Sequence, residues 1–394
     1  MIRRDISNSL ISLAQQFPVV GLFGPRQSGK TTLVKEIFAN YAYVTLEDID
    51  KRRDALEDPR GFFATYASYP GLIIDEVQEA PELLSYIQGI VDQHYRPGYF
   101  IVTGSQHFLL YEKITQTLAG RIALLTLLPL SVQELKIANL LPSTIESLLI
   151  KGGYPRLYAQ PIDVQVWCIN YISTYIEKDV RKVLNITDVI AFQRFLKLCV
   201  ARIGNILNYA DLARDAGISP HTVKSWLSIL EASYIITLLS PFYNNFNKRV
   251  IKSPKLYFYD SALVCSLLGI RTAEELLLHP FKGAIFESFV ISEMLKYFYN
   301  KNELPRLYFW RDAQGHEIDV LIEKSYGITI PVEIKASMTV HDNFYKGIID
   351  WRSISNQSNV SGYIVYAGNE NLIRTKGTIF AWHSIAALLQ SLYT

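Results

Sequence analysis

The sequence has few charges, few cysteines and no long apolar run, and each shortage excludes a class of protein. Charged residues make up 19% of the 394 positions and hydrophobic residues 49%, which excludes a disordered chain and predicts two or three compact domains. The formal net charge of +2 excludes a polycation, so any contact with nucleic acid requires a local basic patch. Three scattered cysteines provide neither a disulfide framework nor pairs of zinc ligands.

Membrane insertion and secretion are disfavoured on similar grounds. The most apolar stretch, residues 122–132, is shorter than the roughly 18 residues of a membrane span and contains Pro129. The polar residues 1–8 do not have the pattern of a signal peptide. We therefore expect a cytoplasmic protein that makes no contact with a membrane.

The order of apolar runs and helical stretches predicts the fold class. Between residues 19 and 131 short apolar runs alternate with helical stretches, which predicts βαβ units around a parallel sheet and an α/β fold. A mostly helical segment follows, then two short helices with two strand-like runs, then a long helix leading into further strands. We predict a parallel-sheet domain over residues 1–135, a helical connector over 136–204, a helix–turn–helix module over 205–272 and a mixed C-terminal domain over 273–394.

A phosphate-binding loop follows the first apolar run. Residues 24–31 read Gly-Pro-Arg-Gln-Ser-Gly-Lys-Thr, the spacing of a phosphate loop between a strand and a helix. Backbone N–H groups of such a loop surround phosphate oxygens, Lys30 contacts the β- and γ-phosphates, and the Thr31 hydroxyl binds Mg²⁺. The alternative is a plain glycine turn. The predicted nucleotide-binding residues are Gly24, Pro25, Arg26, Gln27, Ser28, Gly29, Lys30, Thr31, Thr32 and Ser105.

Polar residues after later strands complete this candidate ATP site. Residues 72–76 are an apolar run ending in Asp75 and Glu76, which predicts that Asp75 holds Mg²⁺ and that Glu76 orients or deprotonates the attacking water. Ser105 or Gln106, after the strand at 100–103, is a candidate sensor of the γ-phosphate; a polar strand end is the alternative. Two arginines, Arg121 as a finger and Arg156 as a lid residue, are further candidates, and either could equally be a surface arginine.

A helix–turn–helix pattern and a basic segment predict contact with DNA. Residues 209–216 and 220–230 read as two helices, with Ser219 as the N-cap and Pro220 at the first helical position. Strand-like runs at 234–239 and 255–259 would form a wing. The predicted DNA-binding residues are Lys224, Lys248, Arg249, Lys252 and Lys255. One lysine and no arginine on the second helix disfavour sequence-specific reading, so nonspecific DNA contact and protein docking both remain open.

The C-terminal strands carry a set of residues suited to metal-assisted hydrolysis. Asp319 lies mid-strand between apolar neighbours, and Glu333 and Lys335 share one face of the strand at 328–335. Asp319 and Glu333 would bind Mg²⁺ or Mn²⁺, while Lys335 would position water or stabilise developing charge. Glu287, on the preceding helix, could add a further carboxylate. The alternative is a structural ion pair between one of these carboxylates and Lys335 or Arg311.

These segments, with residues 118–121, 152–155 and 252–258, resemble an AAA+-type, archaeal-type family of prokaryotic ATPases with a C-terminal domain of the PD-(D/E)xK nuclease superfamily. The resemblance covers nearly the whole chain. It implies a P-loop NTPase domain, a helical lid with a winged helix, and a C-terminal α/β nuclease-like domain, and it defines the architecture more than the biological role.

Two functions are compatible with these residues. The first is an ATP-hydrolysing AAA+-type protein acting on or near DNA, with ATP and Mg²⁺ as cofactors and a metal-dependent nuclease-like end. The second is an ATP-driven switch that binds protein or DNA without cutting. A complete acidic set at the C-terminal end favours the first, and the modest net charge favours the second. A homo-oligomer is compatible with both.

Overall fold

The computed structural model describes residues 2–105, 114, 116–176, 188–242, 253–325, 327–355 and 360–393. Its N-terminal domain is built on a five-stranded parallel sheet with the order β2-β3-β4-β1-β5. The strands are β1 (Val19–Phe23), β2 (Ala42–Thr45), β3 (Leu72–Asp75), β4 (Phe100–Gly104) and β5 (Ile122–Thr126). Because all five run in the same direction, their carboxyl ends meet at one edge of the sheet.

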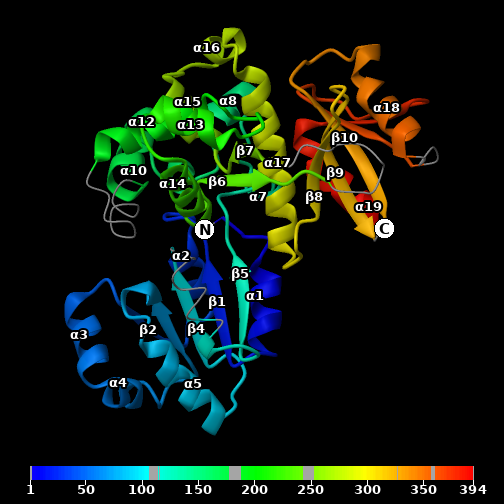
Figure 1. Ribbon diagram of the computed structural model, residues 1–394. Helices are drawn as coiled ribbons and strands as arrows, with labels where there is room; N and C mark the ends of the chain where they lie inside the picture. The colour runs from blue at the N-terminus through cyan, green and yellow to red at the C-terminus, as the bar shows by residue number, and fades with distance from the viewer. Residues whose placement is uncertain are drawn as a thin grey trace.

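Helices cover both faces of this sheet and create two separate apolar cores (Figure 1). One face packs against α1 (Ser7–Ala14) and α2 (Lys30–Ile37), whose Leu10 and Leu33 are buried. The other face packs against α3 (Ile49–Glu57), α4 (Pro59–Thr65), the short 3₁₀ turn η1 (Val77–Glu79) and α5 (Leu83–Gln93). A sheet covered on both faces explains why β1, β3 and β4 are buried along their whole length rather than at alternate positions.

The middle of the chain is helical, as predicted, and it contains the expected helix pair and hairpin. Gly217, with φ +73°, ends one helix, and the Ser219 side chain caps the next by accepting a bond from the Thr222 N–H. The two short strands after this helix pair in antiparallel fashion. The elements are α7 (Val132–Ile137), α8 (Ile145–Lys151), α9 (Arg156–Ala159), α10 (Val164–Tyr171), the π-helical turn η2 (Ile172–Ile176), α12 (Val189–Val200), α13 (Tyr209–Ala216), α14 (Pro220–Ala232), β6 (Ile236–Leu239), β7 (Lys255–Phe258), α15 (Ser261–Leu268) and α16 (Ala273–Leu278).

The C-terminal domain is a six-stranded mixed sheet between helices, with the order β12-β13-β11-β10-β9-β8. Strands β8, β9 and β10 are antiparallel neighbours, and β11 then joins β10 in parallel. The buried apolar side chains of β10 belong to the same core as those of α17 and α19, while Trp351 of α18 packs with Ile318 and Leu321 of β9. The elements are α17 (Lys282–Asn300), β8 (Leu307–Arg311), β9 (Glu317–Ser325), β10 (Ile328–Lys335), η3 (Asp342–Tyr345), α18 (Lys346–Ser355), β11 (Tyr363–Tyr366), β12 (Leu372–Arg374), β13 (Gly377–Ala381), η4 (Trp382–Ser384) and α19 (Ile385–Tyr393).

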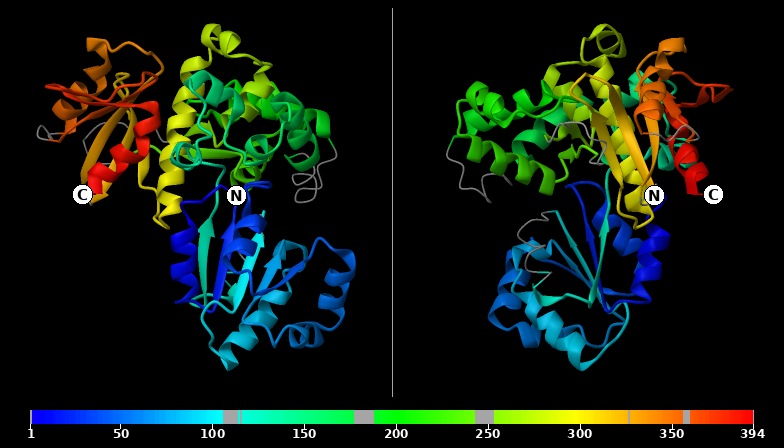
Figure 2. Two further views of the ribbon diagram at one scale, coloured as in Figure 1. Left: turned by 180° about the vertical axis from the view of Figure 1, so that it is seen from behind. Right: turned by 45° about the vertical axis from the view of Figure 1, so that its right-hand side comes forward.

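One continuous apolar core joins the middle of the chain to the C-terminal domain. It includes buried residues from Leu128 to Leu392 and passes through α17, which runs between the two parts (Figure 2). The modules predicted at 136–204, 205–272 and 273–394 therefore share a core, whereas the parallel-sheet domain has its own. The fold is the mixed α/β class predicted from the sequence. Within the described residues, no helix is long and apolar enough to cross a membrane.

A buried arginine near the start of the chain ties the parallel-sheet domain to the middle of the molecule. Arg4 donates one bond to the Ser28 carbonyl, at 2.7 Å, and one to the Leu128 carbonyl, also at 2.7 Å. Its third contact is an ion pair of 3.0 Å with Glu134, which is completely buried at the start of α7. This single side chain thus connects the phosphate loop, the strand exit after β5 and the first helix of the middle region.

Replacing Arg4 should destabilise the protein strongly. Arg4→Met leaves Glu134 as a buried carboxylate without its cation, and removing one partner of a buried pair costs about 3–5 kcal/mol. Urea unfolding of the two proteins measures the difference. Arg3→Met is the matched control, since Arg3 is exposed; a similar destabilisation in both variants would show that the buried pair is not the cause.

Candidate nucleotide and C-terminal carboxylate sites

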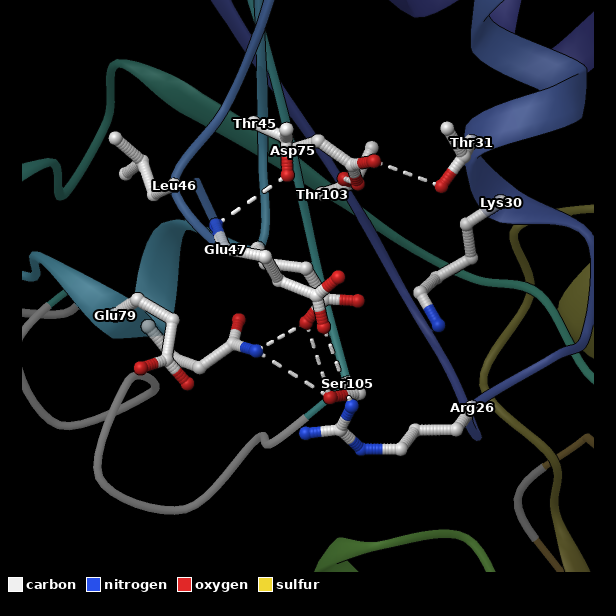
Figure 3. Close-up of polar contacts among 12 residues, drawn as sticks. Arg26, Lys30, Thr31, Thr45, Leu46, Glu47, Asp75, Glu79, Thr103 and Ser105 are labelled. Atoms are coloured by element: carbon white, nitrogen blue, oxygen red, sulfur yellow. Dashed lines mark hydrogen bonds and ion pairs between the residues drawn. The ribbon is translucent and has the colours of Figure 1, made fainter. Parts of the chain in front are cut away.

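The predicted phosphate loop connects β1 to α2 at the carboxyl edge of the parallel sheet, as in Figure 3. Gly24 has a φ of +154°, and a Cβ there would lie 2.1 Å from the Leu127 carbonyl oxygen, so only glycine fits. Gly29, with φ +96°, is the left-handed residue from which α2 begins. The Lys30 ammonium is buried and donates to the carbonyls of Gly24 and Pro25, at 3.0 and 2.8 Å. The lysine is thereby held over the loop on which phosphates would rest.

Asp75 at the end of β3 lies beside the helix start. The Thr31 hydroxyl donates to Asp75 Oδ2 at 2.8 Å, and Thr103 donates to Oδ1 (Figure 3). The Tyr43 hydroxyl also donates to Oδ2, at 2.8 Å. Burial, followed by the charge of Asp75, raises the pKa of Tyr43, so this hydroxyl stays a donor. A threonine hydroxyl and a carboxylate side by side are oxygen donors of the kind that Mg²⁺ prefers. These two residues fit the ion that the sequence predicted for them.

Glu76 follows Asp75 and lines a pocket beside the phosphate loop, together with Lys30 and Thr31. Its backbone is left-handed, with φ +56°, a conformation that is strained for a residue with a side chain. Gln78 and Ser105 hold its carboxylate: Ser105 Oγ donates to Oε2 at 3.2 Å, and the Gln78 amide donates to the same atom. Ser105 therefore lies next to the candidate base, while its alternative, Gln106, falls outside the described residues.

The pocket beside the loop has a volume of about 720 Å³ and is shared between two parts of the chain. Lys30, Thr31, Thr32 and Glu76 line one side, and Arg156 and the residues around it line the other. Arg156, predicted as a lid residue, therefore reaches the nucleotide pocket. The apolar end is formed mainly by Leu130, Leu140, Pro155, Tyr158 and Ala159, which gives the pocket a surface suited to a base.

Two hydrogen bonds form a second link between the helical region and the phosphate loop, and no sequence motif predicts them. The Trp167 indole N–H of α10 donates to the Gln27 side chain at 3.1 Å, and the Tyr171 hydroxyl donates to the Arg26 carbonyl at 3.2 Å. Arg26 itself forms an ion pair of 3.4 Å with Glu47, after β2. The middle of the loop is therefore held by two aromatic residues that lie 140 and 145 positions further along the chain.

Arg121 does not reach this pocket. It precedes β5 at the amino edge of the sheet, on the opposite side from the phosphate loop, and forms an ion pair with Asp92 of α5. The prediction that Arg121 acts as a finger arginine is therefore wrong for the nucleotide bound by its own chain. A role toward a neighbouring copy remains a prediction.

The C-terminal strands bring three of the predicted residues together. Lys335 lies 3.5 Å from Asp319 Oδ2 and also contacts Glu333 on its own strand. The backbone N–H of Ile334 donates to Asp319 Oδ2 at 2.7 Å, which fixes this carboxylate across the β9–β10 pair. Burial, followed by the nearby charge of Asp319, raises the pKa of Glu333 to about 8. The arrangement is an ion-pair cluster, in agreement with the alternative considered for these residues.

Lys255 is a member of this cluster and not an exposed residue of a wing. Its side chain is 4% exposed, and its ammonium contacts Glu287 at 3.4 Å and Glu317 of β9. The prediction that Lys255 binds DNA is therefore wrong for this conformation, because the side chain is buried and already paired with two carboxylates. Tyr257, two residues on, donates its hydroxyl to Glu287 at 2.5 Å. Burial raises the pKa of Glu287 to about 7 against the opposing effect of Lys255.

Of the other four residues predicted to bind DNA, one is exposed on the surface and three fall outside the described part of the chain. Lys224 is exposed on α14, near the ring of Tyr209, whereas Lys248, Arg249 and Lys252 lie outside the described residues. In the part of the chain that is described, no group of three or more His, Cys, Asp or Glu side chains is arranged to hold a metal ion. The ammonium groups of Lys255 and Lys335 instead form ion pairs with the C-terminal carboxylates.

Comparison with known proteins finds three family matches along the chain. Residues 16–136 match the AAA domain family, residues 143–274 match a domain of unknown function (DUF8612), and residues 282–385 match another (DUF4143). The chain is 32% identical over 342 residues to the uncharacterized protein Rv2008c of Mycobacterium tuberculosis, covering 86% of this chain and 74% of that protein. The uncharacterized protein Mb2031c of Mycobacterium bovis gives the same values.

Among solved structures, the Walker-type ATPase PABY2304 of Pyrococcus abyssi is 16% identical and has a TM-score of 0.45, covering 68% of this chain and 96% of that one. DnaA from Aquifex aeolicus with bound AMPPCP is 14% identical, with a TM-score of 0.30, covering 57% and 85%. The matched domain and the parallel sheet with its phosphate loop define an ATPase of the AAA type. The chain belongs to the same family as the two mycobacterial proteins, and it contains an AAA domain and a C-terminal DUF4143 domain.

Loss of the Lys30 ammonium should weaken ATP binding by about tenfold to a hundredfold. A hydrogen bond to a charged group contributes about 1.5–3 kcal/mol, and Lys30→Ala removes a cation from the phosphate loop. Titration with a fluorescent ATP analogue measures the affinity. Lys35→Ala is the matched control on the same helix, because Lys35 is exposed and lies over the Tyr43 ring, outside the pocket. Equal affinities in the two variants would contradict the assignment of Lys30.

Proposed function

We propose that the protein is an Mg²⁺-dependent ATPase whose hydrolysis is coupled to movement of its helical region. The observation that supports this most directly is the contact of Thr31 with Asp75 beside a pocket that also contains Glu76. These are the residue types that P-loop NTPases use to hold Mg²⁺ and to activate water. The pocket walls come from both the sheet domain and the helical region, so the nucleotide would contact both.

Each residue of the site has a chemical task in this proposal. Lys30 leaves the carbonyls of its own loop to meet phosphate oxygens, and the backbone of the loop donates N–H groups to them. Thr31 and Asp75 would hold Mg²⁺, which when bound neutralises developing charge on the phosphates. Glu76 accepts the proton of the attacking water. Ser105, already bonded to Glu76, positions this carboxylate and also meets the terminal phosphate.

Hydrolysis should depend on the carboxylate of Glu76. Glu76→Gln retains the shape of the side chain but removes the general base, which typically costs about 10²- to 10⁴-fold in rate. ATP binding should remain, so a phosphate-release assay and a binding titration on the same variant separate the two steps. Glu79→Gln is the control, since Glu79 follows three residues later and pairs with Arg52. Turnover at the wild-type rate in Glu76→Gln would assign the base to another residue.

The C-terminal domain supports a nuclease-like function in this proposal. A helix carrying Glu287 precedes an antiparallel strand pair carrying Asp319, Glu333 and Lys335, the combination expected for Mg²⁺- or Mn²⁺-assisted hydrolysis of a phosphodiester. Glu333 Oε1 is buried and has no hydrogen-bond partner among the described residues. A buried oxygen without a donor costs free energy unless a cation meets it, and this atom is where a divalent ion would bind.

The second candidate is an ATP-driven switch that binds protein or DNA without cutting. The observation that favours it is the set of cations already seated in the cluster: Lys255 with Glu287 and Glu317, and Lys335 with its two carboxylates. In either case DNA contact would be nonspecific and would involve the helix–turn–helix module, with Lys224 exposed on its second helix. A protein partner and a homo-oligomer remain predictions.

The two candidates differ in what a divalent ion does to the C-terminal domain. If Asp319 and Glu333 bind metal, Mn²⁺ should raise the unfolding temperature of full-length Lys30→Ala protein without nucleotide, because the ion binds the folded state alone. Asp319→Asn in the same background should abolish the shift. Glu323→Gln on the same strand is the control. An unchanged unfolding temperature with Mn²⁺ would favour the switch.

A truncated protein that begins at residue 273, the start of the predicted C-terminal domain, would be unsuited to this measurement. It would lack Lys255 and Tyr257, which contact Glu287 from β7. Removing them would leave a buried carboxylate without its partners, so the metal response of the fragment would not represent that of the full chain. The full-length protein keeps the cluster intact.

A further inference from the structure

A groove at the amino edge of the parallel sheet has no part in the ATP site or the C-terminal cluster. It lies between α4 and α5, beside the first residues of β4, and has a volume of about 810 Å³. The phosphate loop is at the opposite edge of the same sheet. Both helices lie at the end of the molecule away from the middle and C-terminal parts (Figures 1 and 2). A ligand in this groove would therefore meet neither of the other sites.

Four phenylalanine and tyrosine side chains line the groove. Phe63 and Phe100 are buried at its base, with ring centroids 5.7 Å apart in an edge-to-face arrangement. Tyr99 packs edge-on against Phe100 and is half-buried. Tyr86 of α5 is 41% exposed. Tyr86 and Tyr99 thus present ring surface to solvent along the groove.

The charged side chains that line the groove are all basic. Arg60 and Arg96 line it together with His94, and no carboxylate of the described residues does so. The Arg96 guanidinium lies 4.9 Å from the centre of the Tyr99 ring. In the part of the chain that is described, neither Arg60 nor His94 has an ion-pair partner, and both are exposed. An anion can therefore approach these side chains without displacing an acid.

We propose that this groove binds single-stranded nucleic acid. A base stacks on Tyr86 or Tyr99, and the phosphates on either side meet Arg60 and Arg96. Stacking surfaces flanked by basic side chains are the combination with which proteins hold single strands, because every base has an aromatic face and every nucleotide carries a negative charge. A groove of this volume accommodates a ligand of nucleotide size. An acidic peptide would satisfy the arginines but would leave the exposed ring faces unused.

Gly89 provides a way to fill the groove without disturbing the fold. It lies on α5, lines the groove, and a Cβ at this position would meet no atom within 4 Å. Gly89→Trp places a large side chain in the space that the base would occupy. Gly89→Ala is the matched control, because it makes the same change to the backbone of the helix and leaves the groove open.

The test measures binding of a fluorescently labelled oligothymidylate of about 12 nucleotides, within the usual site size for single strands. Anisotropy is recorded with the full-length protein at low salt, without ATP. Gly89→Trp should weaken binding at least tenfold, and so should Tyr86→Ala. Tyr86→Phe, which keeps the ring, and Gly89→Ala should remain close to the wild-type affinity.

Salt dependence tests the contribution of the arginines. Replacing Arg60 and Arg96 together by glutamine should lower the slope of log affinity against log salt by about 0.7 for each phosphate that the protein no longer neutralises. An unlabelled duplex of the same length should compete poorly, because its bases are already stacked. ATP-analogue binding in every variant, measured at the opposite edge of the sheet, reports whether the domain is folded.

Three results would overturn the proposal. The first is a wild-type protein that does not bind the single strand at low salt. The second is equal binding by wild-type, Gly89→Trp and Tyr86→Ala proteins, which would place the strand elsewhere. The third is duplex competition as strong as that of the single strand, which would exclude stacking. None of these outcomes affects ATP hydrolysis or the metal response of the C-terminal domain, so they test this groove separately from the proposed function.

Discussion

The side chain of Arg4 is the contact on which the relation between the two halves of the molecule depends. The sheet domain has its own two cores, and a separate core joins the middle of the chain to the C-terminal domain. Arg4 crosses the boundary by binding the Ser28 carbonyl, the Leu128 carbonyl and Glu134 at once. A guanidinium suits this position because it presents several donors in a fixed plane and keeps its charge when buried. The phosphate loop is thereby fixed to the segment through which the chain enters its helical region.

A second polar cluster joins the β6–β7 hairpin to the C-terminal domain. Lys255 belongs to β7, while its partners Glu287 and Glu317 belong to α17 and β9. Burial lowers the pKa of this lysine, but the two carboxylates raise it above its ordinary value. The lysine therefore remains charged inside the interface. Any movement of the hairpin relative to the C-terminal sheet would have to separate charges that have little access to water.

Local patterns in the sequence predict part of this structure. The phosphate loop follows from spacing, the helix after Ser219 and Pro220 follows from capping, and the contact of Glu333 with Lys335 on one face of β10 follows from strand periodicity. The partners of Arg4 and Lys255 do not follow from any such pattern. These bonds join residues 24 to 130 positions apart, and no periodicity relates positions across such distances. The sequence pattern does not predict the groove between α4 and α5 either, because these two helices come together only when the chain folds.

The bond between Trp167 and Gln27 gives the protein a natural optical reporter. Gln27 lies in the middle of the phosphate loop, so a nucleotide entering the loop changes the surroundings of this indole ring. Trp226 is packed between Phe192 and Phe195, and the other three tryptophans belong to the C-terminal domain. We therefore expect nucleotide binding to change the fluorescence of Trp167. Occupancy of the ATP site can then be followed in the unlabelled protein, in real time.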